Sequence, residues 1–130
     1  MHPNIAPYGE LFVCADGSRI VLAVGSNEQF KALCLALDLS HLVHDQHFST
    51  NAKRVTNRNV LAQMLAPAIA SVPREELLTI LRDAGVPAGA VNSIDQALGS
   101  ATARNMVLEE MIDGVRTLRL RGNAFRIESY

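Results

Sequence analysis

Three histidines in one short stretch are the first side chains whose spacing is compatible with metal binding. His41, His44 and His47 recur every third residue, so a helix would bring them near one face. Zinc, however, needs ligands of controlled geometry and a second shell that orients each imidazole. Leu42 and Val43 lie between the histidines, and no further Cys or His accompanies them in this stretch. We therefore predict no metal site.

Three aspartates, Asp16, Asp45 and Asp113, are the candidate carboxylates for covalent catalysis. A carboxylate nucleophile must be exposed and must lie beside donors that stabilise the developing oxyanion. Asp16 and Asp113 each precede a glycine, a pair that is typical of a tight turn. No phosphate-cradling glycine motif, Gly-x-Ser-x-Gly or His-Glu-x-x-His occurs. We therefore assign no catalytic residue.

Two groups of cationic residues each allow two interpretations. Arg54, Asn57 and Arg58 lie at i, i+3 and i+4, so a helix would place them on one surface, either solvated or in contact with another domain or subunit. A second group near the C-terminus is suited to the phosphate groups of a ligand or to protecting an edge strand by charge: Arg116, Arg119, Arg121 and Arg126. The alternation Arg119-Leu120-Arg121 favours the edge strand.

The elements that must position these residues begin with a β-hairpin. Two β-rich runs, 11–15 and 19–24, flank Asp16-Gly17-Ser18, where a tight turn is expected. Residues 107–112 and 117–120, around Asp113-Gly114, indicate a second hairpin that could share one antiparallel sheet with the first.

Helices are predicted between the hairpins. Ser26 with Gln29 and Ser93 with Gln96 have capping-box spacing and mark two helix starts. A longer helix begins near Asn51, with Pro67 kinking it or ending it early, and Pro73 suits the first turn of the next. The helix that begins at Pro73 is expected to end at Ala84-Gly85, and the loop Val-Pro-Ala-Gly-Ala-Val follows it. A further short helix is expected over residues 101–106. The predicted class is α+β, with several helices packed on a small antiparallel sheet built from the N- and C-terminal hairpins.

Composition sets the class of protein. A chain of 130 residues with 48% hydrophobic and 19% charged residues has the balance of one globular domain. The net charge of -1 gives no reason to expect nucleic acid or an anionic membrane as partner. Cys14 and Cys34 lie in apolar runs without Cys-x-x-Cys spacing, so we expect buried free thiols. No run of about 18 apolar residues occurs, and a cytoplasmic protein is expected.

Four segments in order along the chain carry a resemblance to a known family. They are His2-Pro3-Asn4-Ile5-Ala6-Pro7-Tyr8, Ala15-Asp16-Gly17, Phe48-x-Thr50-Asn51-x2-Arg54-Val55-x-Asn57-Arg58, and Ala84-Gly85-Val86-Pro87-Ala88-Gly89-Ala90-Val91. In this register the chain resembles the smaller domain of family III CoA transferases, the CaiB/BaiF group. The resemblance covers nearly all of residues 1–130, which we therefore expect to be a single domain.

The resemblance implies a function that this chain would share with a larger partner. Full members of the family are longer, and the aspartate that forms their acyl anhydride lies in a large N-terminal domain that this chain does not contain. We therefore expect a piece of a longer enzyme, inactive alone, whose partners are that large domain and, in the full-length protein, a second subunit. The parent enzyme would use coenzyme A or acyl-CoA as substrate, with no tightly bound cofactor.

The resemblance also places CoA near the first strand, so the predicted CoA-contacting residues are Val13, Cys14 and Ala15. A plain hairpin strand is the alternative for these three residues. For the function, the alternatives are an acyl-CoA racemase or carnitine dehydratase-like enzyme and a non-catalytic interaction module. A contiguous exposed apolar patch would be needed by an interaction module and by an isolated domain alike.

Overall fold

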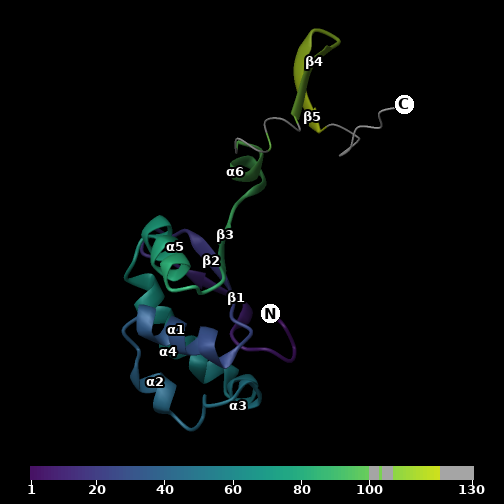
Figure 1. Cartoon of the computed structure of the whole chain (residues 1–130). Helices are drawn as coiled ribbons and strands as arrows, with labels where there is room; N and C mark the ends of the chain where they lie inside the picture. Colours follow the sequence, from purple (N-terminus) through teal and green to yellow (C-terminus); the bar gives the residue numbers. More distant parts are fainter. Residues whose placement is uncertain (100–102, 104–106, 121–130) are drawn as a thin grey trace, which may run out of the picture. The chain divides into compact units, whose positions relative to one another are not determined.

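The structure, a computed structural model, describes residues 1–99, 103 and 107–120. The chain divides into two compact units, Met1–Val91 and Asn92–Tyr130. Within the described residues each unit has its own antiparallel sheet (Figure 1). The prediction of one domain over 1–130 stays a prediction.

The sheet of the first unit starts from the predicted hairpin. Strands β1 (Tyr8–Val13) and β2 (Arg19–Ala23) pair antiparallel around a turn in which Gly17 adopts a φ of 75°. A third strand, β3 (Ala88–Val91), pairs antiparallel with β2, so the order is β1-β2-β3. The sequence pattern had indicated a loop for this segment. Alternate side chains of β1 separate sharply, since Phe12 is buried and Leu11 is exposed.

Five helices complete the first unit: α1 (Asn27–Ala36), α2 (His41–His44), α3 (Asn51–Thr56), α4 (Arg58–Ala70) and α5 (Arg74–Asp83). The capping box of Ser26 and Gln29 is confirmed at the start of α1. Helix α4 contacts β1 and helix α5 contacts β3. Helices and sheet bury one aliphatic core, whose fully enclosed members include Ile20, Leu22, Leu33, Leu42, Leu61, Leu65, Ile69, Leu77 and Leu81.

The helix predicted to begin near Asn51 is in fact two helices. Asn57 stands between α3 and α4 with φ -100° and ψ 21°, outside helical geometry. Pro67 does not end this helix early, because α4 continues beyond it to Ala70. Leu61, Leu65 and Ile69 recur every four residues and are the buried side chains of α4. Pro67 is exposed, and a proline inside a helix both lacks the N–H of a backbone hydrogen bond and crowds the carbonyl four residues earlier, here that of Gln63.

The second unit contains α6 (Ile94–Leu98) and the hairpin of β4 (Val107–Ile112) and β5 (Val115–Leu120). Ser93 and Gln96 form the predicted capping box. Asp113 and Gly114 connect the strands with φ values of 51° and 79°, the two left-handed residues of a tight hairpin turn. The helix predicted over 101–106 falls almost wholly outside the described residues.

The predicted α+β class is confirmed, but the two hairpins belong to separate sheets within the described residues. The third strand of the first sheet is β3, paired with β2. Among the described helices, none combines the length and the apolar character that a membrane span requires.

Candidate functional site

A polar cluster from α3 and α4 holds the N-terminal segment, residues 2–7, which precedes the first strand. Asn51 Nδ2 donates to the Asn4 carbonyl at 2.8 Å, and Asn51 Oδ1 accepts the Ala6 N–H at 3.1 Å. Arg54 Nε donates to the Ala6 carbonyl at 2.9 Å. The side chains thus bind main-chain atoms of a segment that lacks regular secondary structure, and such buried polar groups require partners.

Arg58 extends this cluster to Glu10 on the first strand. We call the four residues Asn51, Arg54, Arg58 and Glu10 the clamp. Arg58 Nη2 donates to the carbonyls of His2 at 2.6 Å and Ile5 at 2.8 Å. Its Nε lies 3.2 Å from Glu10 Oε1, an ion pair with both side chains largely buried. Neither Glu10 oxygen has a hydrogen-bond donor in the described part of the chain, so the pair is held by charge rather than by aligned hydrogen bonds.

Among the described residues, Arg54 is the most deeply buried cation, with a relative exposure of 1%. Its Nη1 donates to the Phe48 carbonyl at 3.1 Å, and its guanidinium carbon lies 4.6 Å from the centre of the Phe30 ring. Burial lowers the pKa of Arg54 because it disfavours the charged form. Carbonyl dipoles and the aromatic face are the contacts that offset this cost.

Neither sequence interpretation of Arg54, Asn57 and Arg58 describes this arrangement. Two of the three are buried or nearly buried, and they bind the chain's own N-terminal segment instead of solvent. Asn57 Nδ2 donates to the carbonyls of His47 and Lys53, at 3.1 and 3.0 Å, and so ties the helix break to the preceding loop.

The predicted CoA-contacting residues lie at the end of β1 and the start of its turn. Val13 is exposed on the outer sheet face, whereas the Cys14 side chain is buried and burial raises the pKa of its thiol. The Cys14 N–H donates to the Ser18 carbonyl and the Ala15 N–H to the Val72 carbonyl. Backbone donors at Cys14 and Ala15 are therefore already paired, and the Cys14 carbonyl accepts the Gly17 N–H. The exposed side chains of Val13 and Ala15 are left for any ligand.

The aspartates considered as nucleophiles are held in turns. Asp16 accepts the N–H groups of Ser18 and Arg74, and these hydrogen bonds, the Ser18 bond above all, lower the Asp16 pKa. Asp45 accepts the N–H of His47, which likewise lowers the Asp45 pKa. Asp113 forms the left-handed corner of the second hairpin. Turn chemistry thus explains Asp16 and Asp113, as predicted.

The histidines do not converge on one point. His41 and His44 delimit the short helix α2, and His47 Nδ1 lies 2.8 Å from Asp45 Oδ1 beyond its end. In the ranges that the structure describes, no three His, Cys, Asp or Glu side chains gather as metal ligands.

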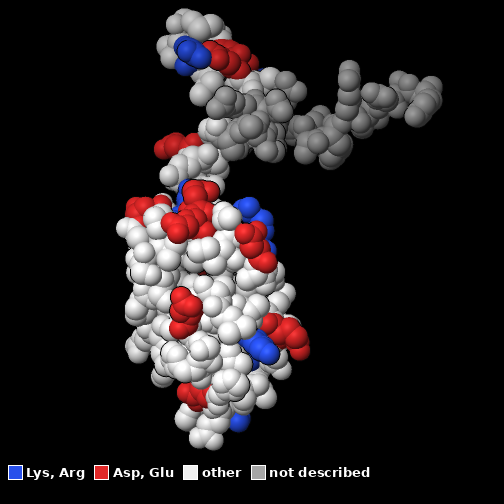
Figure 2. Space-filling view, turned by 60° about the vertical axis from the view of Figure 1, so that its left-hand side comes forward, with Lys and Arg blue, Asp and Glu red and all other residues white. Residues whose placement is uncertain are grey.

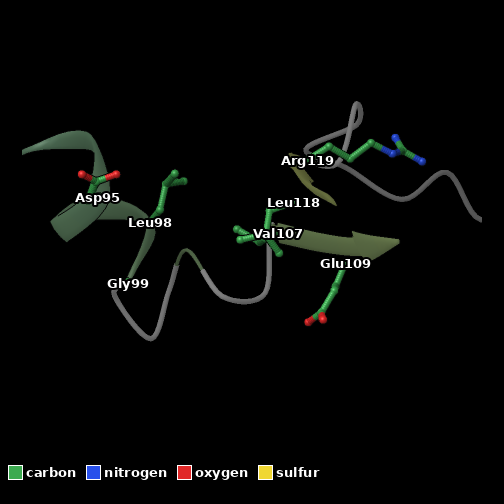
Figure 3. Close-up of a pocket in the computed structure, with 7 residues that line it drawn as sticks. All are labelled: Asp95, Leu98, Gly99, Val107, Glu109, Leu118 and Arg119. Carbon is green, nitrogen blue, oxygen red and sulfur yellow. The ribbon is translucent and has the colours of Figure 1, made fainter. Parts of the chain in front are cut away.

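The arginines of the second hairpin are paired across its strands. Arg116 pairs with Glu109, which raises the Arg116 pKa, and Arg119 pairs with Glu110. Arg121 and Arg126 lie outside the described residues. This pairing agrees with a charge-protected strand. A hollow of about 480 Å³ in this unit is lined by Glu109 and Arg119 among other residues. Figure 3 shows that these two side chains point in different directions.

Charge is dispersed on the face of the first unit that Figure 2 shows. Acidic and basic side chains are interspersed there, and broad areas carry neither. This face offers no continuous cationic surface of the kind that nucleic acid requires.

Comparison with known proteins decides the family. The sequence model of CoA-transferase family III matches residues 1–129. The chain belongs to CoA-transferase family III. This confirms the resemblance inferred from the four segments.

Relatives within the family are identical to this chain at about a third of the aligned residues. The succinate–glutarate CoA-transferase of Agrobacterium fabrum is 34% identical over 89% of this chain and 30% of its own length. The acetyl-CoA:oxalate CoA-transferase of Acetobacter aceti is 31% identical over 99% of this chain and 32% of its own. A CaiB/BaiF family protein from Brucella suis has a solved structure that matches with a TM-score of 0.80 and 32% identity, over 97% of this chain and 32% of that one. The chain therefore spans about a third of the length of these relatives.

Sequence reasoning missed two members of the clamp, Asn51 and Glu10. A usable signal was present for Asn51, because Asn51, Arg54 and Arg58 lie at i, i+3 and i+7 on a predicted helix. Glu10 offered no such signal, since a carboxylate at the start of a strand is ordinarily solvated.

Proposed function

We propose that this chain is the small-domain part of a CoA-transferase that moves CoA between an acyl-CoA and a carboxylic acid. The observation that carries the proposal is the family match over 1–129, together with relatives that are CoA-transferases acting on dicarboxylates. The same relatives favour transfer over racemase or dehydratase chemistry. Coenzyme A or its thioester is then the substrate, and no tightly bound cofactor is required.

The nucleophile in this proposal comes from another part of the enzyme. Asp16 and Asp45 accept backbone hydrogen bonds in turns, and Asp113 forms a turn corner. A carboxylate that is held this way is stabilised in its ground state and is a poorer nucleophile. We infer that a large domain supplies the reacting aspartate, so the chain alone is inactive.

An apolar area on the outer face of the first sheet supports assembly with that domain. Leu11 and Val13 are 58% and 56% exposed, and Val21 lies opposite Leu11 in the ladder. Since the relatives are about three times longer, the remainder of the parent enzyme is the occupant we infer for this face. Val13, Cys14 and Ala15 would then contact CoA at the domain boundary, and the assembled enzyme would be a homodimer.

A chimera tests the proposal. This chain replaces the matching third of the Acetobacter aceti enzyme, and CoA transfer from acetyl-CoA to oxalate is measured beside the isolated chain. We expect transfer by the chimera and none by the chain alone. A folded but inactive chimera would contradict the proposal, and turnover by the isolated chain would contradict the need for a large domain. Val13→Asp in the chimera should raise the KM for acetyl-CoA if Val13 contacts CoA.

A further inference from the structure

Strand β3 has one free edge in the first unit. The Ala23 N–H donates to the Pro87 carbonyl at 2.9 Å, so Ala23 and Pro87 form a hydrogen-bonded pair of the β2–β3 ladder. Because hydrogen-bonded and non-hydrogen-bonded pairs alternate in an antiparallel ladder, the N–H and C=O groups of Ala88 and Ala90 face away from β2. Within the described residues no backbone hydrogen bond is recorded on that side.

The side chains of this edge are unusually small for a strand. Gly89 has no positive φ, and a Cβ built there would meet only Val21 Cγ1, at an ordinary 3.6 Å. Neither conformation nor packing therefore requires glycine, although glycine in a strand costs roughly 0.5–1 kcal/mol relative to alanine. A glycine inside a strand often marks a place where a ligand or another backbone comes close.

A hollow of about 470 Å³ lies against the same edge. Helix α5 lies beside β3 (Figure 1), and the hollow is lined by Leu78 and Arg82 of α5 and by residues 85–90. Its volume falls in the range of small-molecule sites. Arg82 is exposed, and the described part of the chain records no ion pair for it. A cation is thus available for an anionic ligand group.

We propose that the free edge of β3 and this hollow bind the phosphopantetheine arm of a CoA thioester. Pantetheine carries two secondary amides separated by two methylenes, and amides are the groups that pair with a strand edge. The outward groups of Ala88 and Ala90 recur at about 6.8 Å, two residues of a strand. Arg82 faces a phosphate of the same ligand. This inference rests on the proposed function, because the relatives' substrate is what selects CoA among amide-bearing ligands.

Ala90→Pro is the discriminating variant. It removes an outward N–H without removing a bond to β2, and proline is accepted on edge strands. The matched cationic variants are Arg82→Gln, at the hollow, and Arg19→Gln, an exposed arginine of β2 that does not line it.

The experiment is a titration of the ¹⁵N-labelled chain with acetyl-CoA, 4′-phosphopantetheine and pantetheine, followed by amide chemical shifts. We expect the shifts to centre on Ala88–Ala90 and on Arg82. Ala90→Pro should weaken all three ligands about five- to tenfold. Arg82→Gln should weaken the two phosphorylated ligands about fivefold and leave pantetheine unchanged, while Arg19→Gln should change none of them.

Three results would overturn the inference. They are shifts on other residues with none at Ala88–Ala90, no shifts with millimolar ligand, and shifts at β3 with an unlabelled extended peptide but not with acetyl-CoA. None of these results would contradict the proposed function, which is tested separately by the chimera assay of transfer by the whole enzyme. An inactive chimera with intact binding at β3 would instead contradict the proposed function alone.

Discussion

Arg54 donates from Nε to the Ala6 carbonyl at 2.9 Å, across 48 residues of sequence. This bond joins the helix α3 to a segment that precedes the first strand. Because Arg54 has a relative exposure of 1%, water cannot replace the bond when it is lost.

Replacing this guanidinium should therefore destabilise the fold. Arg54→Lys cannot reach the Ala6 and Phe48 carbonyls together, and a lysine charge would remain buried. We expect the free energy of unfolding to fall by about 2–4 kcal/mol, measured by urea denaturation. Arg19→Lys, at an exposed position, is the control and should change stability by less than about 0.5 kcal/mol. Equal stability of the two variants would show that the clamp contributes little.

The ion pair of Glu10 and Arg58 should show coupling. Glu10→Gln leaves the partly buried Arg58 without its counter-charge, so we expect a loss of about 1–3 kcal/mol. In a double-mutant cycle with Arg58→Gln, the two losses should not add, because each removes the same interaction. If the two losses were strictly additive, the ion pair at 3.2 Å would contribute nothing to the free energy of unfolding.

Gly9 and Gly17 provide a matched pair of left-handed glycines. Their φ values are 77° and 75°, but a Cβ at Gly9 would lie 2.9 Å from the Met1 nitrogen whereas one at Gly17 would meet nothing within 4 Å. Both alanine variants carry backbone strain of about 1 kcal/mol, and Gly9→Ala adds crowding. We expect Gly9→Ala to lower the melting temperature more than Gly17→Ala. The reverse order would contradict the close packing of the N-terminus on β1.

Asp16 should contribute to stability in a pH-dependent way. Its folded-state pKa is lowered, chiefly by the Ser18 N–H, so its contribution is present above its unfolded pKa of about 3.9 and is lost as pH falls through the folded value. Asp16→Asn should therefore be less stable than the wild type at pH 7, and the gap should close in acid. A constant gap from pH 7 to pH 2, in thermal melts, would contradict this account.

The two thiols should be unreactive until the chain unfolds. Cys14 and Cys34 are buried, and burial raises the pKa of Cys34 to about 11. Since the thiolate is the reactive form, we expect slow modification by a disulfide reagent in buffer and rapid release of two equivalents in denaturant. Rapid modification of either thiol in buffer would indicate frequent local opening around it.

Local signals in the sequence were sufficient to predict the helix caps, the tight turns and the buried helix faces. Ser26–Gln29 and Asp113–Gly114 act within a few residues, so their patterns predict their structures directly. The strand β3 was missed because Ala-Gly-Ala has little β propensity, and the segment becomes a strand only by pairing with β2.

The burial of Arg54 was missed for a similar reason. Its spacing with Asn57 and Arg58 is typical of a solvated helix face, but the N-terminal segment covers it from 48 residues away. A pattern confined to one helix carries no information about such a distant cover. The same limit applies to Glu10 on strand β1, whose partner Arg58 lies on helix α4.

The clamp also has a consequence for evolution. Asn51, Arg54 and Arg58 bind the backbone of Asn4, Ile5 and Ala6, and backbone atoms are the same in every residue. Mutations can therefore change the side chains at positions 4 and 5 without altering the path of the chain. The likeness of Asn4 and Ile5 to the family therefore needs a cause other than these bonds, which would hold any side chain at the two positions on the same path.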